Sequence, residues 1–153
     1  MRLRNLHWFA WLLICFVTLA ACQRNVTPDD LVNKNIDELK VPPDKSAMIG
    51  SVISKVTGEP LALYGVRLAK VFWFEGTDQG AYVLDGGSSP GDDTDENGVF
   101  IFNDLEPADY VIIVGDVIGY NDVVTDSDGK ARVFKTEPGQ VLKIEPLYVN
   151  LPK

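Results

Sequence analysis

The fold is decided by Asp93-Thr94-Asp95-Glu96-Asn97-Gly98-Val99-Phe100-Ile101-Phe102-Asn103-Asp104-Leu105-Glu106-Pro107-Ala108-Asp109-Tyr110, near the middle of a 153-residue chain. Asp, Asn and Gly tolerate turn and left-handed backbone conformations, so residues 95–98 are expected to form a turn. Residues 99–102 are β-branched or aromatic, which favours a strand. The stretch therefore predicts a turn that opens directly into a strand.

The second half of this stretch predicts a corner and another strand. Pro107 suits the corner, because a backbone N–H is not needed there. Residues 110–114 are almost wholly apolar, which is typical of a central strand buried on both faces. Alternation along the two strands predicts a shared core that contains Phe100, Phe102, Tyr110 and Ile112.

The rest of the chain predicts further short strands separated by turns. They are expected at residues 48–56, 66–74, 81–84, 122–125, 131–136 and 141–151. In the last of these, a continuous apolar face requires the chain to slip by one residue at Glu145-Pro146, which predicts a bulge. About seven short strands without a convincing helix predict an all-β fold, an antiparallel Greek-key β-sandwich over residues 47–153.

The turn, strand and corner resemble the signature of the carboxypeptidase regulatory-like domain, a transthyretin-type β-sandwich. The matching residues are Asp95, Gly98, Phe100, Phe102, Leu105, Pro107 and Tyr110. A second family element is matched by Gly50-Ser51-Val52, Gly58-Glu59-Pro60-Leu61 and Gly65-Val66. The chain departs from the pattern at Ala108, where the family usually has Gly, and at the longer link Ala62-Leu63-Tyr64. The resemblance implies the sandwich fold and selects no function.

The N-terminus has the organisation of a bacterial lipoprotein signal. Arg2 and Arg4 precede an apolar segment of signal-peptide length, which ends in Leu19-Ala20-Ala21-Cys22. Small residues before a Cys resemble a lipobox, which implies a signal peptide over residues 1–21 and attachment of a lipid such as palmitate at Cys22. A buried hydrophobic helix and cleavage at an ordinary small-residue site are the alternatives. The lipoprotein reading places the protein at the bacterial cell membrane, exposed outside the cytoplasm.

Residues 22–46 are expected to hold the lipidated Cys and a flexible linker. The segment is polar and contains prolines, and as a flexible coil it would reach roughly 25–30 Å. Residues 29–40 leave a short helix open as an alternative, since Asp29 and Asp30 suit a helix start.

Composition excludes several classes of activity. His7 and Cys15 lie in the signal and Cys22 is expected to be acylated, so histidine-based triads, cysteine nucleophiles and the usual zinc sites are not expected. A pair of carboxylates is the remaining catalytic arrangement, and no pair is singled out, so we expect no enzyme. With 14 basic and 22 acidic residues, the formal net charge of −8 disfavours nucleic acid as a partner.

Asp93, Asp95, Asn97 and Gly98 match the opening of a calcium-binding loop, with Asp104 at the twelfth position. Flanking helices are not predicted, however, and the strand at residues 99–102 would carry Asp104 away. A plain turn is therefore favoured over a weak metal site at Asp93, Asp95 and Asn97. Calcium remains the one cofactor left open.

Aromatic residues offer a second candidate site. Phe72 and Phe74 are expected in the core, which leaves Trp73, with Tyr82, as a candidate contact for a ligand. The sequence thus predicts a membrane-anchored lipoprotein that presents a non-catalytic binding or structural module to an envelope protein or a polysaccharide. The alternative is a carbohydrate-binding or calcium-stabilised adhesion module.

Lipid attachment is directly testable. We expect Cys22→Ala to release the protein from membranes or to leave it unprocessed, as measured by fractionation and by mass spectrometry of the N-terminus. An unmodified mature N-terminus at Gln23 or later in the wild type would contradict the prediction. In a cell with two membranes, Gln23 after the Cys resembles an outer-membrane sorting signal.

Overall fold

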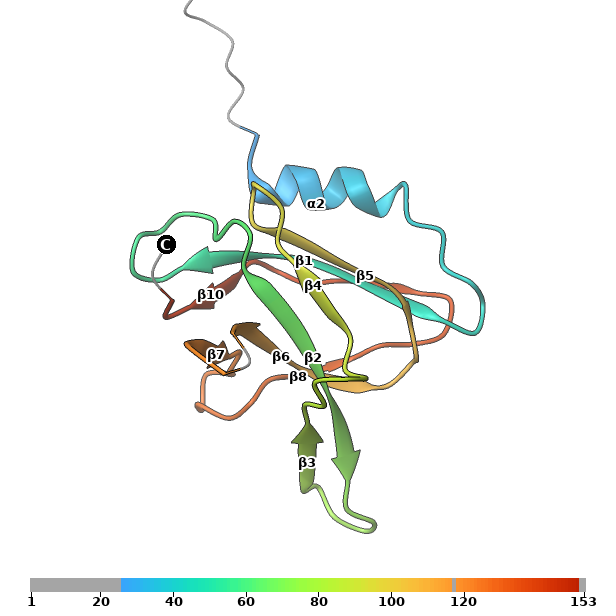
Figure 1. Ribbon diagram of the computed structural model, residues 1–153. Coiled ribbons are helices and arrows are strands. Elements are labelled where there is room, and N and C mark those ends of the chain that lie inside the picture. The colour runs from blue at the N-terminus through green and yellow to red at the C-terminus, as the bar shows by residue number, and fades with distance from the viewer. Residues whose placement is uncertain (1–25, 117, 152–153) are drawn as a thin grey trace, which may run out of the picture.

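The computed structural model describes residues 26–116 and 118–151 (Figure 1). It contains one described helix and ten strands, several of them only three residues long. The elements are α2 (Pro28–Ile36), β1 (Ser46–Ser54), β2 (Gly65–Trp73), β3 (Gly80–Val83), β4 (Gly91–Asp93), β5 (Val99–Leu105), β6 (Asp109–Gly115), β7 (Asn121–Val123), β8 (Val133–Lys135), β9 (Val141–Lys143) and β10 (Leu147–Val149).

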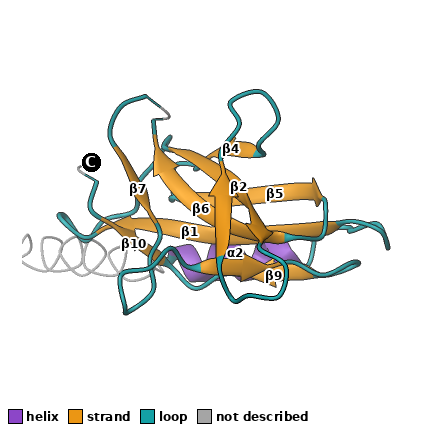
Figure 2. Ribbon diagram, turned by 90° about the horizontal axis from the view of Figure 1, so that it is seen from below, coloured by secondary structure: helices purple, strands orange, loops and turns teal. Residues whose placement is uncertain are grey.

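The strands form two sheets that pack face to face, with α2 across the outer face of one of them (Figures 1 and 2). In the four-stranded sheet, β1 lies between β5 on one side and β9 and β10 on the other. In the six-stranded sheet, β2 and β6 form the antiparallel centre, flanked by β3 and β4 on one side and by β7 and β8 on the other. The predicted all-β sandwich is confirmed.

The main core lies between the two sheets. Phe100, Phe102, Tyr110 and Ile112 are all buried there in a single cluster, as alternation predicted. The rings of Phe100 and Phe102 lie 5.8 Å apart between centroids and are tilted against each other by 57°. The predicted face assignment of both strands is therefore correct.

The corner between β5 and β6 is fixed by hydrogen bonds. The Tyr110 hydroxyl donates to the carbonyl of Glu106, four residues upstream, at 2.8 Å. The Thr136 hydroxyl donates to the carbonyl of Ala108 at 3.0 Å and accepts from its N–H at 3.0 Å. The Ala108 carbonyl also accepts from the Thr136 N–H at 2.9 Å, so three hydrogen bonds join the corner to Thr136 in a part-buried position.

Helix α2 replaces much of the flexible linker expected over residues 22–46. Thr27 caps the helix by a reciprocal pair of bonds with Asp30, and Pro28 occupies the first turn, where its missing N–H costs nothing. Val32 is 1% exposed and packs on Ile49 and Val99 of the underlying sheet. The helical alternative is therefore correct for residues 29–36, whereas residues 37–45 are turns and irregular backbone. Residues 22–25 lie outside the described residues.

Strands β9 and β10 pair with β1 in parallel, whereas the sequence predicted an antiparallel sandwich. Met48 pairs with Leu142 in β9 and Val52 pairs with Leu147 in β10, so the register moves by one residue between the two pairs. This is the slip predicted at Glu145-Pro146. It keeps Ile144, Leu147, Val149 and Leu151 buried in the main core.

The core assignment gives a stability prediction. Phe102→Ala removes a buried ring and should lower the free energy of unfolding by about 3–5 kcal/mol, measured by urea denaturation. Phe72→Ala is the matched control, because Phe72 is 53% exposed and its truncation should cost far less. Equal losses in the two variants would contradict the assignment.

Candidate functional site

A two-stranded extension of the six-stranded sheet carries most of the exposed aromatic residues. Strand β2 pairs with β6 only as far as Lys70, whereas its pairing with β3 continues to Trp73 opposite Gly80. We call residues 70–83 the arm, which projects from the body of the sandwich on the side away from α2 (Figure 1). Its exposed aromatic side chains are Phe72, Trp73, Phe74 and Tyr82.

The prediction that Phe72 and Phe74 belong to the core is wrong. Their side chains are 53% and 54% exposed. Phe72 does lie on the same face of β2 as buried Val66 and Leu68, but the arm extends past the facing sheet. Alternation therefore predicts the correct face for Phe72. Its side chain is exposed because the facing sheet does not extend far enough to cover it.

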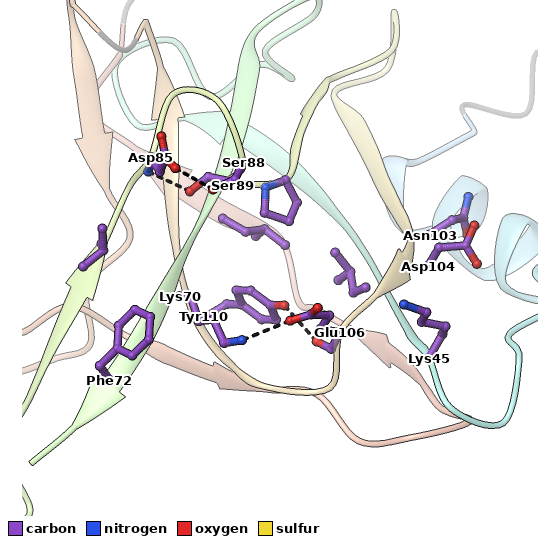
Figure 3. A pocket seen from close by; sticks show the side chains of 14 residues that line it. Lys45, Lys70, Phe72, Asp85, Ser88, Ser89, Asn103, Asp104, Glu106 and Tyr110 are labelled. Atoms are coloured by element: carbon purple, nitrogen blue, oxygen red, sulfur yellow. Dashed lines mark hydrogen bonds and ion pairs between the residues drawn. The ribbon is translucent and has the colours of Figure 1, made fainter.

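One face of the arm forms the wall of a cleft with a volume of about 690 Å³ (Figure 3). Phe72 lies at one end of the cleft, Lys45 and Asp104 lie at the other, and Lys70, Glu106 and Tyr110 lie between them. The loop at residues 85–90 closes a further side. The cleft thus combines an apolar wall with a ring of hydrogen-bonding side chains.

Ion pairing and burial set the charges in the middle of the cleft. The Lys70 ammonium donates to a Glu106 carboxylate oxygen at 3.1 Å, and this bond and its charge lower the pKa of Glu106. Burial, with the nearby Glu106 charge, raises the pKa of Tyr110. At neutral pH, Glu106 is therefore ionised and the Tyr110 hydroxyl keeps its proton. On the loop, hydrogen bonds from Ser88 and Gly87 lower the pKa of Asp85.

A bulge in β5 shapes the far end of the cleft. Ser46 pairs with Leu105 but Met48 pairs with Phe102, so Asn103 and Asp104 both lie opposite Ala47. The backbone of Asp104 has φ +55°, which lies in the left-handed region. Residues other than Gly, Asn and Asp rarely adopt this conformation. Bulges redirect side chains and are over-represented near functional sites. Sequence analysis did not predict this bulge.

The opposite face of the arm carries a smaller hollow of about 270 Å³. Trp73 and Tyr82, the predicted ligand contacts, both line it, and the structure brings them together on one face. Their side chains are 50% and 44% exposed. The indole N–H of Trp73 donates to a carboxylate oxygen of Asp109 at 2.6 Å.

The acidic stretch at residues 93–98 forms a turn. One carboxylate oxygen of Asp95 accepts from the N–H groups of Asn97 and Val99, both at 2.8 Å, and Gly98 has φ +76°. Asp126 makes the same pair of bonds to Asp128 and Lys130, with Gly129 also at φ +76°. Asp104 lies in the cleft instead. Among the described residues, no three His, Cys, Asp or Glu side chains gather closely enough to hold a metal ion.

Cys22 lies outside the described residues, so the structure places no lipidation site. Within residues 26–116 and 118–151, none of the helices is long and apolar enough to span a membrane.

No protein-family model matches the chain, and no curated protein matches it. The resemblance to the carboxypeptidase regulatory-like domain therefore stays an expectation.

Several solved bacterial structures share the sandwich architecture. A DUF3823 family protein from Bacteroides uniformis is 16% identical at a TM-score of 0.43, over 69% of this chain and 43% of that one. A candidate carbohydrate-binding protein from Pseudomonas aeruginosa is 15% identical at a TM-score of 0.42, over 75% and 95%. The major pilin BcpA of Bacillus cereus is 17% identical at a TM-score of 0.40, over 67% and 30%. The chain spans less than half of the first and third of these proteins. Such likenesses carry no argument about a ligand.

The turn geometry sharpens the calcium prediction. The Asp95 carboxylate is already held by two N–H groups and Asp104 lies in the cleft, so adding millimolar calcium to chelator-treated protein should barely change its melting temperature. Differential scanning calorimetry measures this. A rise of about ten degrees that Asp95→Ala abolishes would contradict the prediction, because stabilisation of that size requires a calcium concentration far above the dissociation constant.

Proposed function

We propose that this chain is a lipid-anchored surface protein whose sandwich is a non-catalytic carbohydrate-binding module, with the saccharide held in the cleft. One observation carries the proposal: the half-exposed Phe72 lines the same cleft as the charged and polar side chains of Lys45, Lys70 and Glu106. This is the carbohydrate-binding alternative from the sequence, and the cleft supports polysaccharide over an envelope protein as the partner.

The chemistry of the cleft matches that of a sugar. A pyranose ring has an apolar C–H face and a perimeter of hydroxyl groups that both donate and accept hydrogen bonds. Phe72 offers a surface for the apolar face, while Lys45 and Lys70 can donate to hydroxyl oxygens and Glu106 can accept from hydroxyl protons. A volume of about 690 Å³ lies within the range of ligand sites, which combine apolar walls with a few placed polar groups.

Two carboxylates in the cleft are suited to accepting hydrogen bonds from a sugar. A glycoside hydrolase needs one carboxylic acid that stays protonated, with its pKa raised by its surroundings. The two carboxyl groups of the cleft with a shifted pKa, Asp85 and Glu106, both shift downward. Both are therefore ionised at neutral pH and can accept hydrogen bonds from a sugar, but neither can donate a proton to a leaving group.

The position of α2 limits how far the domain could lie from a lipid anchor at Cys22. With a lipid at Cys22, only residues 23–27 would precede the helix, and five extended residues span at most about 18 Å. The domain would then sit close to the bilayer, nearer than a linker over residues 22–46 would hold it. The arm projects away from α2 and would therefore point away from the membrane (Figure 1).

Titration with oligosaccharides tests the proposal. The full chain, purified in detergent, is titrated by calorimetry with cellohexaose, chitohexaose and mannohexaose, of which at least one should bind. Phe72→Ala should weaken that binding by about tenfold, the loss expected for truncation of one aromatic contact.

Phe74→Ala is the matched control. Phe74 is as exposed as Phe72 and lies on the same arm, but it lines neither the cleft nor the hollow. Equal losses in the two variants, or the absence of binding by all three oligosaccharides, would contradict the proposal.

A further inference from the structure

The hollow on the opposite face of the arm contains an indole ring that is already fixed in place. The Trp73 side chain is held at its N–H by Asp109, on the neighbouring strand β6, at 2.6 Å. A Cβ atom built on Gly80 would lie 2.9 Å from Cε3 and 3.4 Å from Cδ2 of Trp73, so the ring lies directly over the backbone of Gly80. One side of the indole thus packs on the arm, and half of its surface stays exposed.

Strand register places a second aromatic residue beside this ring. Trp73 pairs with Gly80 and Val71 pairs with Tyr82, so Trp73, Val71 and Tyr82 share one face of the arm. Residues in such diagonal positions lie about 7–8 Å apart, within reach of aromatic side chains. Val111 and Val133 continue the surface as an apolar floor.

The rim of the hollow is polar and of mixed charge. Asp78 and Lys130 both line it, which supplies one hydrogen-bond acceptor and one set of donors around the apolar floor. A neutral polyol can use both groups at once, because each hydroxyl donates and accepts. At about 270 Å³, the hollow is smaller than the usual range of pockets for drug-sized ligands, so it suits a single ring.

From this geometry we propose that the hollow is a second saccharide-binding subsite, in which one pyranose ring stacks on Trp73 beside Tyr82. The inference rests on the proposed function. Its occupant is a saccharide ring rather than an apolar side chain of a partner protein, because a fixed flat aromatic surface with a donor and an acceptor at its rim matches both parts of a sugar.

Two subsites on one arm would have a consequence for binding. Phe72 and Trp73 are neighbours in sequence and lie on opposite faces of the same strand. The cleft and the hollow would therefore hold two saccharide segments back to back, from one polymer or from two. Simultaneous use of linked sites raises the overall affinity for a polymer above that of either site alone.

The test uses the full chain and the oligosaccharide that binds best in the calorimetric titration above. Wild type should bind two molecules per chain, and Trp73→Ala should bind one. Phe72→Ala should bind one molecule in the hollow as the wild type does and one in the cleft about tenfold more weakly. Trp73→Phe keeps an aromatic surface and should restore part of the binding lost in Trp73→Ala. Asp109→Ala, which frees the indole, should weaken the hollow by about tenfold while the cleft binds as before.

Fluorescence distinguishes the hollow from the cleft directly. In the mature lipoprotein, from which residues 1–21 would be removed, Trp73 is the only tryptophan, so a change in emission on adding the oligosaccharide reports binding in the hollow. An unchanged emission together with one bound molecule would overturn the second subsite and leave the cleft intact. Loss of all binding in Trp73→Ala with none lost in Phe72→Ala would instead overturn the cleft. If the emission of Trp73 does not respond to any oligosaccharide but responds to a protein partner, the second subsite is overturned and the hollow binds protein.

Discussion

The structure depends on one strand that must be buried on both faces. Alternate residues of β1 face the main core, among them Met48 and Val52, while Ile49 faces α2. Gly50 makes this packing possible, because the ring of Phe100 occupies the space where a Cβ would stand, 2.8 Å from Cζ. All the partners of the four-stranded sheet attach to this strand. A Cβ at residue 50 would force the ring of Phe100 to shift, and it would also lie 3.1 Å from the Cβ of Ile144.

The sequence predicted the features that depend on local chemistry. The core positions of β5 and β6, the corner at Pro107 and the slip at Glu145-Pro146 follow from alternation and turn propensity, which act over a few residues. Burial of Phe72 depended instead on how far the facing sheet extends, which alternation does not encode. Lys70 did carry that information, because a lysine on an otherwise apolar face marks where the core ends. Helix α2 was hard to predict because its sequence offers few apolar residues, and contact of Val32 with the sheet decides its position.

The candidate site lies where the regular sandwich stops. Its side chains come from the arm, which outruns the facing sheet, and from the bulge at Asp104, where two residues oppose one. Neither feature has a strong sequence signal. At the bulge, the residue with φ +55° is an aspartate and not a glycine, so its backbone conformation could not be predicted from its residue type. The acidic motif at residues 93–98 had the strongest chemical signal. Its repetition at Asp126, with the same bonds and the same glycine conformation, identifies it as a way of forming a tight turn.

The parallel pairing of β9 and β10 with β1 has a consequence for the order of folding. Residues 47–54 form the centre of their sheet, yet half of their pairing partners are residues 141–149, nearly a hundred positions later. Closing so long a loop is entropically costly and tends to make folding slow. While the chain is being synthesised, β1 therefore has one edge without its native partner until residues 141–149 have been made. The four-stranded sheet cannot be completed before then, and loss of β9 and β10 would leave one whole edge of its central strand unpaired.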